Sequence, residues 1–307
     1  MQFGKIVRGG VENYIRKVRI LKEVIQEADA ILIGCGAGLS AAAGLSSPVD
    51  FEENFADFIE KYHMEDAYRG LYSPFASSSE MWAYIARVAW FYRYNTHDNG
   101  LYDDMLEVLK DKNYFFVTTN IDAQLKKAGF EEERIFPLEG DYGEFQCIEP
   151  CHQEVYENEK EIRKLMLSQG FTEDEYGNMI SNENVNRAVK KESIPVCPKC
   201  GRNMALHVNF GAHFARPDEW YISSAAKDDF LLKNRDKKIL YLELGSGPYK
   251  KEFIRHPLWE LTMRNPNATY VCVNLGECSC PEAIEDRSIL LDADIKTVFN
   301  DLVKLNK

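Results

Sequence analysis

Closely spaced glycines near the N-terminus could bring the main chain against a phosphate. They follow the apolar run Ala30–Gly34, and the sequence continues as "CGAGLS" through Gly36–Gly38 to Ser40. Glycines at the start of a helix let main-chain N–H groups face a pyrophosphate, and the Ser40 hydroxyl adds a donor. The spacing differs from the common dinucleotide pattern G-x-G-x-x-G, because Leu39 stands where the third glycine belongs. The alternative is a plain tight turn between a strand and a helix.

A second group of polar side chains follows another apolar run. The run Tyr114–Thr119 leads into Asn120, Ile121 and Asp122. In a pocket, Asn120 and Asp122 could hold a ribose and an amide-bearing base. Both side chains could instead cap the helix that follows, which is a common use of Asn and Asp.

Two pairs of cysteines have the spacing of a zinc site. Cys147 and Cys151 are separated by three residues, and Cys197 and Cys200 by two within "CPKCG". Four thiolates bind one zinc ion tetrahedrally and leave no open position, so the ion would be structural. His152 is a possible substitute ligand, and reduced thiols without a metal are the alternative. The remaining cysteines are expected to be core or surface thiols: Cys35, Cys272, Cys278 and Cys280.

The apolar runs predict a sheet whose strand ends bring these groups together. Besides the two runs above, Lys238–Gly245 and Ala268–Gly276 are expected strands, and Met204–Phe210 has strand-like alternation. Strands that alternate with helices indicate an α/β fold with a parallel sheet covered on both faces. Ligands of such sheets bind at the carboxyl ends of the strands. We therefore expect the glycine loop, "NID", "GSGP" and "NLGE" to meet at one edge of the sheet.

Helical spacing of apolar residues predicts the other main elements. The composition becomes charged at about Cys147 and returns to strand-like alternation at Met204, so we expect a small module at residues 146–202. The larger domain would then combine residues 1–145 and 203–307. Helices are expected at Val11–Ala28, Met81–His97, Leu101–Lys112, Glu154–Ser168 and Asp292–Asn306, with a helix start at Ala41–Leu45 and a loop followed by short helices over residues 46–63.

Composition and charge argue against several classes of protein. The chain has 307 residues, of which 45% are hydrophobic, as in an ordinary globular protein. Its net charge of −12 argues against nucleic acid or an anionic membrane as a partner. The N-terminus has no signal-peptide pattern, and no window approaches the roughly 18 apolar residues of a membrane span. We therefore expect a cytoplasmic protein.

Three segments together resemble the sirtuin superfamily. "GAGLSAAAGL" (Gly36–Leu45) is similar to the sirtuin glycine loop, and "TTNIDAQLKKAG" (Thr118–Gly129) to the T-Q-N-I-D segment that ends in Ala-Gly. The strand that ends in "VNLGE" resembles the one that carries the adenosine-side asparagine. The resemblance covers roughly Ala28 to the C-terminus. It implies a Rossmann-like NAD-binding domain with a smaller module of the zinc-ribbon type.

The resemblance also implies which residues bind NAD. The pyrophosphate is expected at the glycine loop, the nicotinamide riboside at the "TNID" segment, and the adenosine half beyond the last two glycine-ended strands. Asn120 would also help to activate the ribose. The implied residues are Gly36, Ala37, Gly38 and Ser40 at the pyrophosphate; Phe51, Thr119, Asn120, Ile121 and Asp122 at the nicotinamide riboside; and Gly245, Ser246, Asn274 and Glu277 at the adenosine half.

Two positions depart from the pattern of the sirtuin deacylases. Deacylases follow the "NID" segment with a short strand and then a general-base histidine before a glycine, whereas here Glu139 precedes Gly140. They also carry an arginine in the loop G-I-P-D-F-R, and "GLSSPVDFEENF" has none.

Glu139 is the position on which the chemistry depends. A carboxylate there could stabilise the oxocarbenium-like state of nicotinamide–ribose cleavage, hold ribose hydroxyls or deprotonate a nucleophile. With an ordinary glutamate pKa of about 4.3, it would be a poor substitute for a base near neutrality. A solvated loop residue is the alternative.

Both departures match the macrodomain-linked, or class M, sirtuins of microbes, which also resemble this chain in "GDYGEFQC" and "CPKCG". That resemblance implies ADP-ribosyl transfer to a protein rather than efficient deacylation. It implies a lipoylated carrier protein related to the glycine-cleavage H protein as acceptor, and a macrodomain hydrolase as functional partner. An NAD-dependent deacylase, an NAD glycohydrolase and a non-catalytic NAD sensor are the other possibilities.

Overall fold

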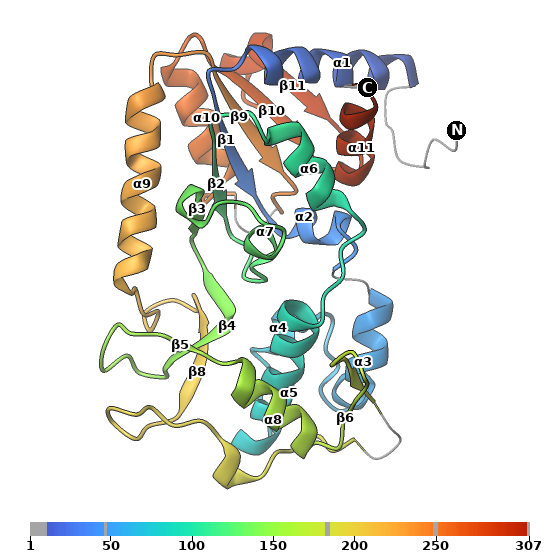
Figure 1. Cartoon of the computed structure of the whole chain (residues 1–307), viewed down its shortest axis with the longest axis vertical. Coiled ribbons are helices and arrows are strands. Elements are labelled where there is room, and N and C mark those ends of the chain that lie inside the picture. The colour runs from blue at the N-terminus through green and yellow to red at the C-terminus, as the bar shows by residue number, and fades with distance from the viewer. Residues whose placement is uncertain (1–10, 46–47, 182–184, 248–250, 306–307) are drawn as a thin grey trace.

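Six parallel strands form the main sheet of the molecule (Figure 1). The computed structural model describes residues 11–45, 48–181, 185–247 and 251–305. The strand order is β11-β10-β9-β1-β2-β3, and each neighbouring pair is parallel. This confirms the predicted α/β, Rossmann-like class. The strands are β1 (Ala30–Cys35), β2 (Tyr114–Thr118), β3 (Ile135–Pro137), β9 (Ile239–Leu244), β10 (Thr269–Val273) and β11 (Ser288–Leu291).

Helices cover both faces of this sheet, which is why β1, β2 and β9 are buried along their whole length. On one face, α1 buries Tyr14, Val18 and Leu21 at helical spacing against the sheet, together with α6 and α11. On the other face, α9 and α10 contribute Phe230 and Leu258 to a separate apolar core. These helices are α1 (Val11–Glu27), α6 (Leu101–Leu109), α9 (Asp218–Asn234), α10 (Arg255–Arg264) and α11 (Ile295–Leu305).

Several helices differ from the sequence-based expectation. The helix α2 (Ala37–Ala42) begins directly after Gly36, four residues before the expected start. One continuous helix, α3 (Pro48–Tyr62), replaces the expected loop and short helices. The helix α5 (Ser78–Ala89) changes into a π-helix at Trp90–Tyr94 instead of continuing to His97. Ser46, Ser47 and Asn306, which fall in expected elements, lie outside the described residues.

A second apolar core includes buried residues of a three-stranded antiparallel sheet, which lies below the main sheet in Figure 1. The buried side chains of this core include Phe55 and Trp82 from the preceding helices, Phe145 from β4 and Ile162 from α8. This core also draws on residues outside 146–202. The predicted domain boundaries stay predictions. Its further elements are α4 (Ala67–Gly70), β4 (Gly140–Cys147), β5 (Tyr156–Glu157), α8 (Glu159–Ser168), β6 (Thr172–Glu173), β7 (Met179–Ile180) and β8 (Met204–Val208).

The connection from β3 to β4 joins the two sheets. Leu138 continues the pairing with β2 through a hydrogen bond from its N–H to the carbonyl of Thr118 at 2.9 Å, and β4 begins at Gly140. Glu139 therefore stands at the junction, next to the carboxyl edge of the parallel strands. Within the described ranges, no helix is long and apolar enough to cross a membrane.

Candidate active site

The glycine turn after β1 packs directly on the turn after β9. The N–H of Gly36 donates to the carbonyl of Leu244 at 3.0 Å, and the N–H of Gly38 to the carbonyl of Gly245 at 2.8 Å. A Cβ atom at Gly36 or Gly38 would lie 2.7 Å from main-chain atoms of Gly245. These two glycines are therefore required for the close approach of two main-chain segments. Their N–H groups are used inside the protein, and Ala37 between them starts α2.

The "TNID" segment lies against the same turn. The side-chain amide of Asn120 donates to the carbonyl of Gly36 at 3.0 Å, and the N–H of Thr119 donates to the carbonyl of Cys35 at 3.1 Å. Ile121 is buried, and its carbonyl accepts from the N–H of Tyr142 at 2.8 Å. The segment thus connects the glycine turn to β4.

Asp122 is joined to the glycine turn through Ser40, whose hydroxyl donates to its carboxylate. The N–H of Gln124 donates to the other carboxylate oxygen at 3.1 Å. Burial raises the pKa of the Asp122 carboxyl above its ordinary value, and the hydrogen bonds from Ser40 and Gln124 offset only part of that rise. Asp122 is therefore a half-buried carboxylate that holds its proton more tightly than an ordinary aspartate.

The predicted adenosine-side residues lie at the ends of β9 and β10. Gly245 adopts a left-handed φ of 64°, and its N–H donates to the carbonyl of Val273 at 3.2 Å. The side chain of Asn274 donates to the carbonyl of Ser246 at 2.9 Å, and both residues are buried. Glu277 follows three residues later and is partly exposed. The sheet therefore brings the predicted pyrophosphate, riboside and adenosine residues to one edge.

Glu139 is 3% exposed, so it is not a solvated loop residue. Its carbonyl accepts from the N–H of Asn209 at 3.0 Å, which connects it to the segment after β8. Burial raises the pKa of the Tyr68 phenol, a contact with Tyr72 lowers it, and the charge of Glu139 raises it further. Tyr68 from α4 is therefore close enough to Glu139 to be affected by its charge.

Phe51 lies on α3, away from the glycine turn along the chain. It is buried in the second core and packs on Phe55 with ring centroids 5.2 Å apart. Its expected place over the nicotinamide stays a prediction.

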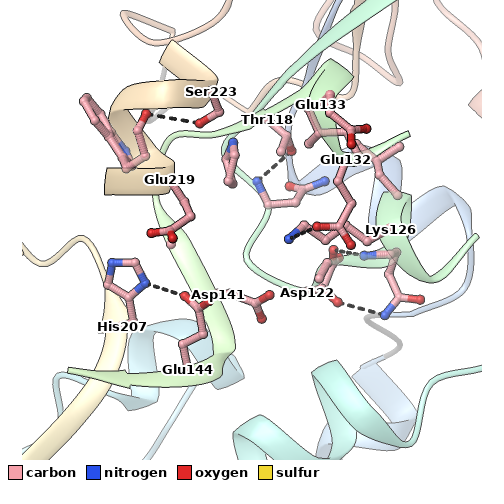
Figure 2. Close-up of a pocket in the computed structure, with 18 of the residues that line it drawn as sticks. Thr118, Asp122, Lys126, Glu132, Glu133, Asp141, Glu144, His207, Glu219 and Ser223 are labelled. Atoms are coloured by element: carbon pink, nitrogen blue, oxygen red, sulfur yellow. Dashed lines mark hydrogen bonds and ion pairs between the residues drawn. The ribbon is translucent and has the colours of Figure 1, made fainter. Parts of the chain in front are cut away.

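A cavity of about 370 Å³ adjoins the "TNID" segment and opens between β4, α7 (Gln124–Lys127) and α9 (Figure 2). Asn120 and Asp122 belong to its wall, while the described residues Gly36–Ser40 and Glu139 do not. Its other walls include apolar side chains such as Leu125, and Figure 2 shows the carboxylates of Asp141, Glu144 and Glu219 along one side of it.

An ion pair of Arg93 and a hydrogen-bonding contact of His207 lie near this cavity. Arg93 pairs with Asp141 at 2.7 Å, and its positive charge offsets a small part of the rise in the pKa of Asp122 that burial causes. The Nδ1 atom of His207 lies 2.7 Å from Glu144, and its Nε2 lies 2.9 Å from the carbonyl of Ala215. Arg93 lies in no recognisable motif, so only its position in the fold reveals it.

The four predicted zinc cysteines converge at the end of β4. Their sulfur atoms all lie within 4.8 Å of one another, with Cys147 and Cys200 3.6 Å apart and Cys151 and Cys197 3.8 Å apart. Sulfurs placed ~2.3 Å from a shared ion at tetrahedral corners are about 3.8 Å apart, so the donor set fits zinc.

The protonation of Cys197 also suits a metal ligand. Burial alone would raise the pKa of this thiol, but the N–H groups of Cys200 and Lys199 and the ring of His152 lower it to about 6. The Nε2 atom of His152 lies 3.4 Å from the Cys197 sulfur, outside the group of four sulfurs. His152 is therefore a neighbour of the cluster, and the four thiols are sufficient for tetrahedral coordination.

Comparison with known proteins gives relatives over nearly the whole chain. No protein-family model matches. A protein ADP-ribosyltransferase of Staphylococcus aureus is 31% identical over 299 residues, which cover 96% of this chain and 89% of that protein. A Fusarium oxysporum protein named "Probable bifunctional ADP-ribose hydrolase/ADP-ribosyltransferase" is 26% identical over 287 residues, which cover 88% of this chain but 44% of that protein.

Solved structures of sirtuins share the fold. A structure of Sir2 with a p53 peptide and NAD+ superposes with a TM-score of 0.53 at 18% identity, covering 94% of this chain and 98% of that one. A structure of Sir2Tm bound to a propionylated peptide gives the same values. The arrangement of the sheet and the smaller module is therefore that of the sirtuins.

Proposed function

This chain belongs to the family of protein ADP-ribosyltransferases with a sirtuin fold, and we propose that it cleaves NAD and transfers the ADP-ribose to a protein. The observation that carries the proposal is the placement of a buried carboxylate, Glu139, beside the edge where Asn120 binds the glycine turn. In the deacylase pattern that position is a histidine. A carboxylate there favours cleavage and transfer over the base-dependent deacylase cycle.

The proposed reaction breaks the bond between C1′ of the ribose and the nicotinamide nitrogen. Nicotinamide leaves with the bonding electron pair, and the acceptor nucleophile forms a bond to C1′ and loses its proton. Glu139 would stabilise the positive charge that develops on the ribose, in a site where burial strengthens the interaction. Asn120 would orient the ribose, because its amide is already fixed by Gly36.

The rest of the NAD molecule would follow the edge of the sheet. We assign the pyrophosphate to the turn of Ala37 and Ser40, since the N–H groups of Gly36 and Gly38 are used inside the protein. The nicotinamide riboside would lie at Thr119–Asp122 beneath Phe51. The adenosine half would lie at Gly245, Ser246, Asn274 and Glu277, beyond the ends of β9 and β10.

Zinc would bind Cys147, Cys151, Cys197 and Cys200 and have a structural role. Four protein ligands leave no position for a substrate, and the ion would tie the end of β4 to the segment before β8. The zinc would therefore support the strand that begins at Gly140, directly after Glu139.

For the acceptor we propose a lipoylated carrier protein of the glycine-cleavage H type. The support is the resemblance of "GDYGEFQC" and "CPKCG" to the macrodomain-linked sirtuins. A hydrolase that removes the modification is proposed as a functional partner, and the name of the Fusarium relative, which joins both activities in one protein, supports such a pairing.

The test uses NAD labelled in its adenylate half, the purified protein, and the carrier with and without its lipoyl group. We expect label on the lipoylated carrier and release of nicotinamide, and Asn120→Ala should abolish both. Equal labelling of the unlipoylated carrier would contradict the proposed acceptor chemistry alone. Transfer itself would be contradicted by label confined to free ADP-ribose, by label in acyl-ADP-ribose, or by NAD left intact.

A further inference from the structure

A buried arginine outside the predicted NAD-binding residues contacts two of their loops. Arg255 is the first residue of α10, and its side chain is 1% exposed. Its Nε donates to the two carboxylate oxygens of Glu243 at 2.9 and 3.2 Å, and its Nη2 donates to one of them at 2.7 Å. Glu243 lies on β9 and is fully buried. Two nitrogens of the guanidinium therefore donate to the carboxylate, and both contact its Oε1 atom, so the two buried side chains restrict each other's position.

The same guanidinium binds main-chain carbonyls from both adenosine-side loops. Nη2 of Arg255 donates to the carbonyl of Glu277 at 2.7 Å and lies 3.3 Å from the carbonyl of Ser246. The side chain of Asn274 donates to that same Ser246 carbonyl at 2.9 Å. The loop after β9 and the loop after β10 are thus joined through one buried nitrogen atom.

Stability alone gives a weak reason for an ion pair at this place. A buried ion pair generally stabilises a protein no more than apolar side chains of similar volume. Glu243 also accepts from the hydroxyl of Tyr270 at 2.5 Å, so its carboxylate is fixed from a second side. A carboxylate fixed in this way fixes the guanidinium, which in turn fixes the two carbonyls.

We propose that Arg255 is a positioning residue that holds the Ser246 and Glu277 loops in their NAD-binding arrangement before NAD arrives. The inference rests on the proposed function, in which these loops bind the adenosine half. Loops ordered in advance lose less conformational entropy on binding, so the contribution of Arg255 should appear in affinity. The bond cleavage occurs at the far end of the substrate, so the chemical step should change little.

Replacement of Arg255 by lysine separates positioning from charge. A lysine ammonium keeps a positive charge beside Glu243, but it is a compact group without the planar fork that reaches Glu243 and both carbonyls. The matched control is Arg87→Lys in the second core. Arg87 is also buried, and it pairs with Asp57 at 2.6 Å without contacting either adenosine-side loop.

The experiment measures the dissociation constant of ADP-ribose by calorimetry, together with KM for NAD, kcat and the melting temperature. For Arg255→Lys we expect both the dissociation constant and KM to rise about tenfold, the effect of losing one charged hydrogen bond, with kcat within about twofold of wild type. Arg87→Lys should lower the melting temperature and leave the affinity for ADP-ribose unchanged. A lower kcat with unchanged affinity in Arg255→Lys would overturn the proposal.

A second measurement covers the case in which Arg255→Lys folds poorly. The double variant Glu243→Gln with Arg255→Met removes both charges and leaves no buried carboxylate unpaired. Without ligand, the amides of residues 274–278 should exchange hydrogen faster in this variant than in wild type, while those of α1 should not. Unchanged exchange in the loop would overturn the proposal. Failure of the wild-type protein to bind ADP-ribose would instead contradict the proposed function.

Discussion

The side-chain amide of Asn120 donates to the main-chain carbonyl of Gly36 at 3.0 Å, across 84 residues of sequence. The bond uses one of the two amide N–H groups and fixes the plane of the amide. Under the proposed function, the other N–H and the amide oxygen would orient a ribose. A residue proposed to act on the substrate is thus positioned by the turn proposed to hold the pyrophosphate, so we expect changes in that turn to impair the reaction as well as binding.

Gly38→Ala tests this dependence. The new Cβ would lie 2.7 Å from the Cα atom and 2.8 Å from the carbonyl oxygen of Gly245, and main-chain atoms there cannot move aside easily. We expect a loss of about 1–3 kcal/mol in the free energy of unfolding, as in overpacked cores, together with weaker binding of ADP-ribose. Denaturant unfolding and calorimetry measure the two effects.

Gly247→Ala is the matched control for Gly38→Ala. Gly247 lies two residues after Gly245, the residue that Gly38 contacts, and a Cβ atom added at Gly247 would have no described atom within 4 Å. Gly247→Ala should therefore fold with nearly wild-type stability. Equal destabilisation by the two substitutions would mean that the close approach of the turns is not what Gly38 permits.

The parts of the site that the sequence predicts are those whose residues lie close together along the chain. The glycine turn and the "TNID" segment each follow an apolar strand, and parallel strands place their carboxyl ends at one edge. The cysteine pairs are likewise visible from spacing alone. In all three cases the chemistry depends on residues that are close in sequence, and the fold brings these short segments together.

The parts that the sequence did not reveal depend on contacts between distant elements. Arg255 on α10 contacts Glu243 on β9 and Glu277 in the loop after β10, and Arg93 in the π-helix contacts Asp141 on β4. No spacing in the chain predicts either set of contacts. The sequence does not predict the helix α9, because Tyr221, Ile222 and Leu232 are apolar but exposed. The apolar residues of α9 therefore do not recur at a clear helical spacing. The helix α2 begins earlier than expected, because Gly36 is in an extended conformation at its N-cap.

Removal of one thiol ligand should release the metal. Cys147 is fully buried and its sulfur lies 3.6 Å from that of Cys200, so Cys147→Ser would leave three thiol ligands and a polar hydroxyl at a closed site. We expect loss of bound zinc, measured by elemental analysis, and a loss of several kcal/mol of stability, since about 10–16 kcal/mol of zinc-binding free energy is coupled to folding in small zinc modules.

Cys280→Ser provides the comparison for the zinc experiment. Cys280 is partly exposed and lies outside the group of four sulfurs. This variant should retain zinc and stability. A wild-type protein purified without zinc and unaffected by Cys147→Ser would favour the reading of these residues as unliganded thiols.

Asp122→Asn should change how stability depends on pH. Burial raises the pKa of Asp122 in the folded protein above the ordinary value of 3.8, so the folded state binds its proton more tightly than the unfolded state. Stability contributed by this group is therefore lost as pH rises from about 3.8 through the raised pKa, and is constant above it. Asparagine does not titrate and removes this loss.

Thermal unfolding of wild type and Asp122→Asn across that range gives the comparison. The melting temperature of the variant relative to wild type should increase with pH and then level off, whatever fixed cost the variant has from weaker bonding to Ser40 and Gln124. A relative melting temperature that falls as pH rises would show that the carboxylate is stabilised in the folded state instead. Transfer of ADP-ribose should be impaired in the variant at every pH.

Glu139→Gln should separate the cleavage step from NAD binding. Glutamine keeps the volume of the side chain and its main-chain bond to Asn209, but it cannot stabilise a developing positive charge as a carboxylate does. We expect kcat for nicotinamide release to fall about 10²–10³-fold, the usual effect of removing one group that stabilises charge in the transition state, with little change in the affinity for ADP-ribose.

Glu133→Gln is the control for the loss of one negative charge near the site. Glu133 is an exposed carboxylate in the wall of the cavity that adjoins Asn120, and its replacement should leave kcat close to the wild-type value. Equal losses in the two variants would indicate that the overall acidic field, rather than the position of Glu139, supports cleavage. Wild-type turnover in Glu139→Gln would remove the carboxylate from the mechanism and leave Asn120 and Asp122 to stabilise the ribose cation.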